Sequence, residues 1–343
     1  YTHYKEVKNG VSTKLYCALP ALLMQCNKKN EFIPVPDWYR DVEYMKEKNR
    51  GYEYREDLYV PGYFEIDIDK GESVVFAAGL KEAATSGLKS KFSKEVNARV
   101  PRNTMRNNLI NSAQQFVVNH DHHFSLIAGY HWYKERLRDT LIAIPGLARF
   151  QEDKKPFVHI LESCIETIRA KYIDIKPELM KLEDVDVPLW LFFTLTLFQN
   201  SGGKTNYLSK NYLLLKQILE FYKKGVPNQL RLLDNGLIDA QRENHALTWM
   251  DAMINGKPVT PRYGSHVEVN ALWYNAIATL LDVAKKQNDH SFIAEWEPFA
   301  EKLKAAFVET YWFDEKGYLY DCVNDGKKDK ALRPNQIIAV SLP

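Results

Sequence analysis

One acidic residue, Asp251, follows directly after two large apolar residues within the segment 247–273, LTWMDAMINGKPVTPRYGSHVEVNALW. An apolar environment disfavours the ionised form of a carboxyl group. Trp249 and Met250 would therefore favour a protonated Asp251, which could donate a proton as a general acid. A structural alternative is that Asp251 caps or hydrogen-bonds its own loop, as short polar side chains often do.

A second acid of this segment, Glu268, has its own structural explanation. Ser265-His266-Val267-Glu268 fits the S-x-x-E capping box that begins a helix. On the helix that follows, Glu268, Asn275, Thr279 and Asp282 are spaced by 7, 4 and 3 residues, which predicts a polar stripe on an otherwise apolar helix. The stripe would face either a polar lumen or solvent.

Aromatic and charged residues also gather in FSLIAGYHWYKERLRDTLIAIPGL, at 124–147. Arg138 and Asp139 precede an apolar helix and could hold sugar hydroxyls by charge-assisted hydrogen bonds, while Tyr130 and Trp132 offer rings for stacking. Asp139 is equally suited to an N-cap. Four histidines lie within twelve residues here, but their irregular spacing matches no metal motif. We expect no metal and no cofactor.

Composition bounds the partners and the location of the chain. Its 343 residues carry 46 Lys plus Arg against 44 Asp plus Glu, so it lacks the basic surface of a nucleic-acid-binding protein. The longest apolar stretch, near 188–198, is too short to span a bilayer, and the first residues have no signal-peptide pattern. The four cysteines are predicted to be reduced core thiols. We therefore expect a cytoplasmic protein without a nucleic-acid or membrane partner.

Strand patterns dominate residues 1–80. FEIDIDKGESVVFAAG alternates apolar and acidic residues, turns at 69–72 and returns through Val74 and Phe76, which is typical of a β-hairpin. We interpret 1–80 as the C-terminal part of an antiparallel β-sandwich. Residues 81–119 have the polarity of a linker helix that ends before Asn119.

Residues 120–343 alternate two kinds of predicted helix. One kind is apolar on nearly all sides, and the other is amphipathic. This alternation predicts a mainly α fold, a partial (α/α)6 toroid barrel of inner and outer helices. The chain stops at Pro343 within an expected inner helix, which predicts a missing C-terminal part, exposed apolar surface and possible self-association. The expected apolar helices are 139–150, 186–198, 267–284 and one that begins in 334–343; the amphipathic ones are 156–172, 209–224 and 294–311.

Five segments, taken together and in this order, resemble the C-terminal amylo-α-1,6-glucosidase domain of glycogen debranching enzymes. They are IAGYHW…RDTLIAIPGL at 127–147, VDVPLW at 185–190, LTWMDA at 247–252, TPRYGSHVEVNALWYNA at 260–276 and LRPNQIIAVSLP at 332–343. YREDLYVPGYFEI at 54–66 further resembles the sugar-binding-type β-sandwich that precedes the barrel in bacterial members.

The resemblance implies an inverting hydrolase that removes α-1,6-linked glucose from the branch points of glycogen or limit dextrin. It implies that Asp251 is the general acid and that the general base, a Glu, lies beyond Pro343. Glycogen or other α-glucan oligosaccharides would be the partners. The residues implied to line the glucose pocket are Trp132, Arg138, Asp139, Trp249, Arg262, Glu268 and Trp273.

The chain departs from the family pattern just before the first inner helix. Where the family has Trp-Gly-Arg-Asp, this chain has Arg136-Leu137-Arg138-Asp139, preceded by Glu135. A stacking ring and a flexible glycine are thus replaced, which predicts an altered pocket floor or weakened activity. Two alternatives remain open: another inverting α-glycosidase on the same barrel, or a catalytically impaired glucan-binding protein.

Overall fold

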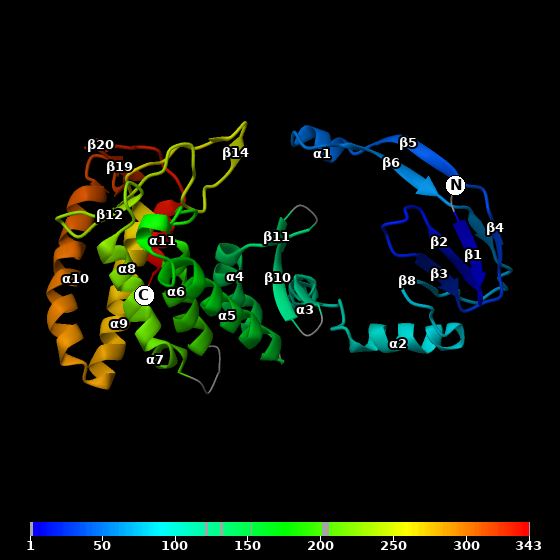
Figure 1. Cartoon of the computed structure of the whole chain (residues 1–343). Helices are drawn as coiled ribbons and strands as arrows, with labels where there is room; N and C mark the ends of the chain where they lie inside the picture. Colours follow the sequence, from blue (N-terminus) through cyan, green and yellow to red (C-terminus); the bar gives the residue numbers. More distant parts are fainter. Residues whose placement is uncertain (1–2, 121–122, 131–132, 152, 201–205, 343) are drawn as a thin grey trace. The chain divides into compact units, whose positions relative to one another are not determined.

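The computed structural model describes residues 3–120, 123–130, 133–151, 153–200 and 206–342. The chain divides into two compact units, residues 1–102 and 103–343 (Figure 1). Among the described residues, no helix combines the length and the apolar character needed to cross a membrane.

The first unit is built from small antiparallel sheets. Four strands pair in the order β1-β2-β3-β8, and β4 with β7 and β5 with β6 form two further pairs. The elements are β1 (His3–Val7), β2 (Gly10–Lys14), β3 (Leu22–Cys26), β4 (Glu31–Ile33), β5 (Asp37–Glu43), α1 (Met45–Asn49), β6 (Arg55–Val60), β7 (Tyr63–Glu65), β8 (Phe76–Gly79), η1 (Thr85–Gly87) and α2 (Leu88–Ala98).

The hairpin predicted around residues 69–72 is wrong in its pairing. The turn itself forms, with the backbone N–H of Glu72 3.0 Å from the carbonyl oxygen of Asp69, but its two arms enter different sheets. β7 pairs with β4 and β8 pairs with β3. The alternation of side chains specifies the two faces of a strand but not its partner; here Phe64 packs on Phe32, with ring centroids 5.2 Å apart.

The second unit is mainly helical, with short antiparallel strands at its loops. Its helices are α3 (Met105–Gln114), α4 (Leu137–Arg149), α5 (Lys155–Ile168), a π-helical turn η2 (Arg169–Ile173), η3 (Pro177–Leu179), α6 (Val187–Asn200), α7 (Tyr207–Lys210), α8 (Tyr212–Lys224), α9 (Val267–Gln287), α10 (His290–Tyr311) and α11 (Asn335–Ser341). Its strands are β9 (Val117–His120), β10 (His123–Gly129), β11 (Tyr133–Glu135), β12 (Leu230–Leu232), β13 (Ile238–Ala240), β14 (Met253–Ile254), β15 (Lys257–Pro258), β16 (Ser265–His266), β17 (Trp312–Phe313), β18 (Tyr318–Leu319), β19 (Cys322–Asn324) and β20 (Lys327–Lys328).

The expected linker helix is two helices, α2 and α3, followed by strand β9. Pro101 stands between them; proline lacks a backbone N–H and keeps the preceding residue, Val100, out of the helical conformation. α3 then begins anew, because the hydroxyl of Thr104 accepts a hydrogen bond from the backbone N–H of Asn107 at 3.1 Å. Such a side-chain cap satisfies one of the free donors at a helix start.

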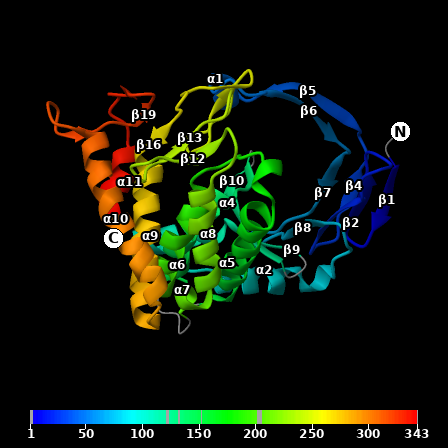
Figure 2. The same ribbon diagram turned by 60° about the vertical axis from the view of Figure 1, so that its left-hand side comes forward.

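Two of the four helices expected to be apolar on nearly all sides are buried in that way. The expectation is wrong for the other two, because α4 buries one face only and α11 buries only Asn335, with Ile337 and Val340 exposed. α6 and α9 are buried on nearly all sides, whereas α5, α8 and α10 each bury one face. α9 contacts α6, α8, α10 and α11, and Figures 1 and 2 show it between α8 and α10. A helix with neighbours on several sides must be apolar around most of its circumference, which is why the sequence pattern identified these helices.

The cysteine prediction holds for three of the four residues. Cys26, Cys164 and Cys322 are buried free thiols, as expected, but Cys17 is exposed. Cys17 lies in the connection between β2 and β3, where no apolar layer covers the side chain. Burial raises the pKa of the Cys164 thiol to about 12, so this thiol is held in its protonated form.

The centre of the helical core is an aromatic group around Trp273, which is fully buried. We expect Trp273→Ala to lower the free energy of unfolding by about 3–5 kcal/mol, the usual cost of removing a large buried ring. Urea unfolding of the variant would measure this. Trp312→Ala, at a half-exposed tryptophan, is the matched control, and equal losses for the two variants would contradict the assignment.

Candidate active site

The loop 247–252 lies between two groups of charged side chains that gather at the beginnings of helices. The Arg138 cluster consists of Arg136, Arg138, Asp184, Asp186 and Asp251, beside the starts of α4 and α6. The Arg262 cluster consists of Arg262, Glu268, Asp321, Arg333 and Asn335, beside the starts of α9 and α11. Both clusters bond to residues of this one loop.

Arg138 holds the first cluster together from a buried position. Its side chain is only 5% exposed, and its Nε lies 3.0 Å from each carboxylate oxygen of Asp186. Its other nitrogens bond to Asp184 and, at 3.2 Å, to Oδ2 of Asp251. Burial by itself lowers the pKa of Arg138, but the three carboxylates outweigh it and raise the pKa above its usual value.

Asp184 is a member of this cluster that the sequence did not single out. Burial raises the pKa of its carboxyl group above the ordinary value, although the charge of Arg138 acts in the opposite direction. Asp186, within the VDVPLW segment, is fully buried and also accepts a hydrogen bond from the indole N–H of Trp190 at 3.1 Å. The acidic pair thus fixes the Arg138 guanidinium against the start of α6.

The surroundings of Asp251 differ from the apolar wall expected from the sequence. Its carboxylate is paired with the guanidinium groups of Arg136 and Arg138, which approach from residues more than a hundred positions earlier. Trp249 and Met250 instead contact Asn335. Residues adjacent in an irregular loop do not share a direction, so sequence proximity did not make them neighbours of the carboxylate.

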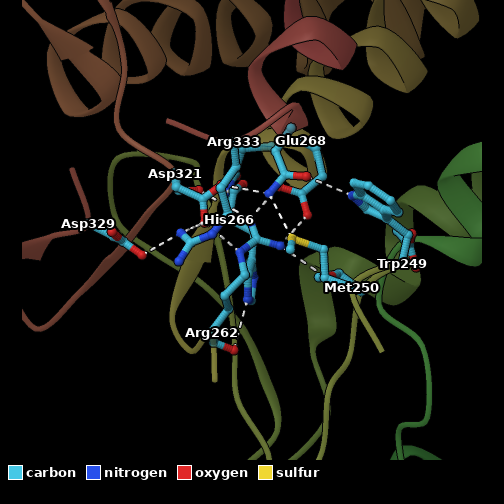
Figure 3. Close-up of polar contacts among 12 residues, drawn as sticks. Trp249, Met250, Arg262, His266, Glu268, Asp321, Asp329 and Arg333 are labelled. Atoms are coloured by element: carbon cyan, nitrogen blue, oxygen red, sulfur yellow. Dashed lines mark hydrogen bonds and ion pairs between the residues drawn. The ribbon is translucent and has the colours of Figure 1, made fainter. Parts of the chain in front are cut away.

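The Arg262 guanidinium is fully occupied by protein groups. It donates to Glu268 through both Nη atoms at 2.7 Å, to the Asp321 side chain and carbonyl at 2.7 and 3.2 Å, and to the Thr248 hydroxyl at 3.1 Å. An arginine has five N–H donors, and all five are used. Figure 3 shows Arg262 among these partners, which leave none of its donors free for a ligand; its expected contact with substrate stays a prediction.

The capping box expected at Glu268 is wrong, although α9 begins where it predicted. The residue preceding the helix is His266, without a side-chain cap, and the Glu268 carboxylate is fully buried against Arg262. A bidentate pair with a guanidinium is stronger than a bond to one backbone N–H, so it takes the carboxylate. The polar stripe runs from buried Glu268 and Asn275 to exposed Asp282.

A glycine allows the chain to bring Arg262 to this position. Gly264 has a φ of +89°, and a Cβ atom there would lie 2.4 Å from the carbonyl oxygen of Val323 in β19. Only glycine readily adopts that conformation and permits that approach. The turn carries the chain from Arg262 into β16, which pairs with β19 next to Asp321.

Sequence reasoning missed Asp321, Arg333 and Asn335 as members of the site. Asp321 is 2% exposed and accepts hydrogen bonds from Arg262, Arg333 and Asn335 at 2.7, 2.7 and 2.6 Å. Arg333 and Asn335 stand in the LRPNQ segment, which the resemblance used without a role for either. Asp321 follows a short strand and has no local pattern that could have revealed it.

Two of the remaining residues predicted to line the glucose pocket, Trp249 and Asp139, are partly exposed. The Trp249 residue is 38% exposed, and the Asp139 side chain is 42% exposed and 3.7 Å from Nε of Arg136. Asp139 lies within the first turn of α4, after Arg136, rather than at the N-cap. Trp132 lies outside the described residues, as do His122 and His131 of the histidine group.

Trp273, which the resemblance places in the glucose pocket, lies in the hydrophobic core of the described structure. It is fully buried, its indole N–H lies 3.2 Å from the carbonyl oxygen of Gly236, and its ring packs on Tyr222, Trp296 and Phe299. These contacts make it part of the packing between α9 and its neighbouring helices α8 and α10.

In the described part of the chain, one group of side chains has ligand atoms close enough for a metal ion. The ligand atoms of Asp321, Cys322 and Asp329 lie within 4.8 Å of one another. Arg333 bridges the two carboxylates at 2.7 and 2.6 Å, and burial raises the pKa of the Cys322 thiol to about 11. These acids are arranged for ion pairs with arginine, and a metal would have to displace Arg333.

The comparisons with known proteins give first a class of fold. A crystal structure of a bacterial glucoamylase complexed with acarbose matches with a TM-score of 0.50 and 11% sequence identity, covering 96% of this chain and 54% of that one. A GH78 family rhamnosidase from Bacillus sp. GL1 matches with a TM-score of 0.45 and 14% identity, covering 97% and 36%. The chain thus spans about half the length of the glucoamylase whose fold it shares.

The sequence comparison is more specific. The family model described as amylo-alpha-1,6-glucosidase matches residues 111–343, and the model described as glycogen debranching enzyme N terminal matches residues 1–75. The chain belongs to the amylo-alpha-1,6-glucosidase family. The resemblance drawn from the five segments is confirmed. A search among curated proteins found no match.

The buried His266 makes the stability of the fold depend on pH. Burial first, and the charge of Arg262 second, lower the pKa of His266 from 6.5 to about 4. The unfolded chain therefore binds a proton between pH 6.5 and 4 that the folded chain does not, so stability is full above pH 6.5 and falls toward pH 4. The loss from this group is roughly 3 kcal/mol at about 1.4 kcal/mol per pH unit.

We expect His266→Gln to remove this part of the pH dependence. The measurement is the free energy of unfolding at pH 7 and pH 4.5 in wild type and variant. His290→Gln, at an exposed histidine, should keep the wild-type slope. Parallel slopes for wild type and His266→Gln would contradict the assignment.

Proposed function

We propose that this chain is part of a glycoside hydrolase that removes α-1,6-linked glucose from branch points of glycogen or limit dextrin, with inversion. Its helical unit would be a portion of an (α/α)6 toroid. The family membership and the glucoamylase-like fold support a glycoside hydrolase. The observation that carries the proposal is that the starts of α4 and α11 and the segments before α6 and α9 all bond to the loop that presents Asp251.

Asp251 is the proposed general acid. Hydrolysis of a glycosidic bond needs one carboxylic acid to protonate the leaving oxygen and one carboxylate to assist attack, and in inverting enzymes the two are about 6.5–9.5 Å apart to admit a water. The side chain of Asp251 is 27% exposed, so solvent and substrate can reach it. We assign Asp251 the proton donation alone.

The other accessible side chains are suited to hold the sugar. Trp249 offers a partly exposed ring, oriented by the hydrogen bond from its indole N–H to Asn335 at 2.7 Å, and apolar sugar faces pack on such rings. Asp139 offers a carboxylate to sugar hydroxyls. Arg138, Arg262 and Glu268 support the pocket through the two clusters rather than by contact with the ligand.

A glucan-binding protein with impaired catalysis is the second candidate function. The observation that favours it is the double ion pair of Asp251 with Arg136 and Arg138. The two ion pairs occupy the carboxylate of Asp251, whereas a general acid must be free to approach the leaving oxygen of the substrate.

The experiment that separates these functions uses the intact natural protein and its Asp251→Asn variant. With phosphorylase limit dextrin as substrate, we expect the variant to lose about 10²-fold or more in kcat, the usual contribution of a general acid, while glycogen binding is retained. Equal binding with no glucose released by either protein would favour the binding function.

Two controls sharpen this experiment. Asp139→Asn changes a carboxylate that also faces Arg136 but that we assign to sugar binding, so it should raise KM more than it lowers kcat. Linear malto-oligosaccharides test the linkage. Glucose released from the linear substrate alone would contradict the debranching specificity and leave another α-glycosidase.

A further inference from the structure

The two guanidinium groups that face Asp251 are held very differently. Arg138 has a 5% exposed side chain and bonds to Asp184 and Asp186 as well as to Asp251. Arg136 has a 39% exposed side chain, and its pair with Asp251 is its close charged contact. The Arg138 guanidinium is therefore fixed in place. The Arg136 guanidinium can separate from Asp251 at a small cost in free energy, because exposed ion pairs are weak.

The Arg136 guanidinium also has other partners nearby, Asp139 and the Tyr133 ring. Its Nε is already 3.7 Å from Oδ2 of Asp139, three residues later on the same helix face. Its guanidinium lies 5.6 Å from the centre of the Tyr133 ring, a distance typical of a cation–π contact. Both partners are partly exposed. A small rotation would exchange Asp251 for Asp139 and keep the contact with Tyr133.

We propose that Arg136 is a removable latch on Asp251: a positioning residue that pairs with the carboxylate and is displaced when a sugar analogue with a basic nitrogen binds. The catalytic meaning of the latch rests on the proposed function, but the displacement itself does not. The ligand class it identifies is a sugar analogue with a basic nitrogen, because an ammonium group competes directly with Arg136 for the same carboxylate.

The charged groups around Asp251 explain why a cationic ligand would be favoured. In the described structure the charged groups that face Asp251 are Arg136 and Arg138, with Asp139, Asp184 and Asp186 behind them. An ammonium group that replaces Arg136 keeps two positive charges beside the carboxylate, whereas a neutral sugar would leave only one.

The test compares Arg136→Gln with wild type in two ligand titrations by calorimetry. The probes are 1-deoxynojirimycin, a glucose analogue with a basic ring nitrogen, and maltose, which is neutral. Removal of the competing charge should tighten binding of the cationic analogue by roughly ten-fold, the scale of one partly exposed charge pair, and change maltose affinity by less than about three-fold. Arg149→Gln, at an exposed arginine on the same helix, should change neither.

Other outcomes overturn the latch. Equal changes for both ligands, or none for either, would show that Arg136 does not compete at Asp251. Arg136→Lys keeps the charge without the fork of donors and should resemble wild type more than Arg136→Gln does; if it binds the cationic analogue as tightly as Arg136→Gln, charge is not the cause. If neither ligand binds any variant, the sugar site itself is wrong.

Activity separates the latch from the proposed function. An active wild type in which Arg136→Gln changes the affinity of neither ligand overturns the latch and leaves the function intact. An inactive wild type with the expected binding difference overturns the function and leaves the latch.

Discussion

The buried guanidinium of Arg262 is the constraint on which the arrangement of the site depends. A charge taken out of water is tolerated only when it is paired and hydrogen-bonded. Arg262 meets this condition with Glu268, Asp321 and Thr248, which use all five of its donors. These partners come from the start of α9, the approach to β19 and the loop 247–252, so satisfying one side chain fixes three separate segments.

The Arg138 cluster also pairs a buried guanidinium with carboxylates, but one of those carboxylates is partly exposed. Arg138 is buried against Asp186 and Asp184, yet one of its nitrogens reaches Asp251, which is partly exposed. The ion pairs of the candidate site thus range from fully buried ones at Arg262 to a partly exposed one at Arg136. The buried pairs fix the positions of the side chains around Arg262. The partly exposed pair at Arg136 is weak enough to be exchanged for bonds to a ligand.

The sequence predicted two of the buried helices well and the environment of Asp251 poorly, for physical reasons. α6 and α9 were recognisable because a helix buried on all sides needs an apolar sequence throughout. The neighbours of Asp251 could not be read from the residues beside it, since Trp249 and Met250 turn to Asn335. The segments that became the site were identified through a family resemblance, whereas Asp184 and Asp321 were found only in the structure.

Trp249 bonds to a residue 86 positions later, and Arg262 to one 59 positions later. During synthesis from the N-terminus, Arg262 and Glu268 emerge together, but the Asp321 partner and the Asn335 anchor of Trp249 arrive much later. Until then the nascent chain holds a guanidinium whose pairing is incomplete, which opposes its burial. The order in which the chain emerges therefore leaves Arg262 without one of its carboxylates, and Trp249 without its anchor, until the segment that begins α11 has been translated.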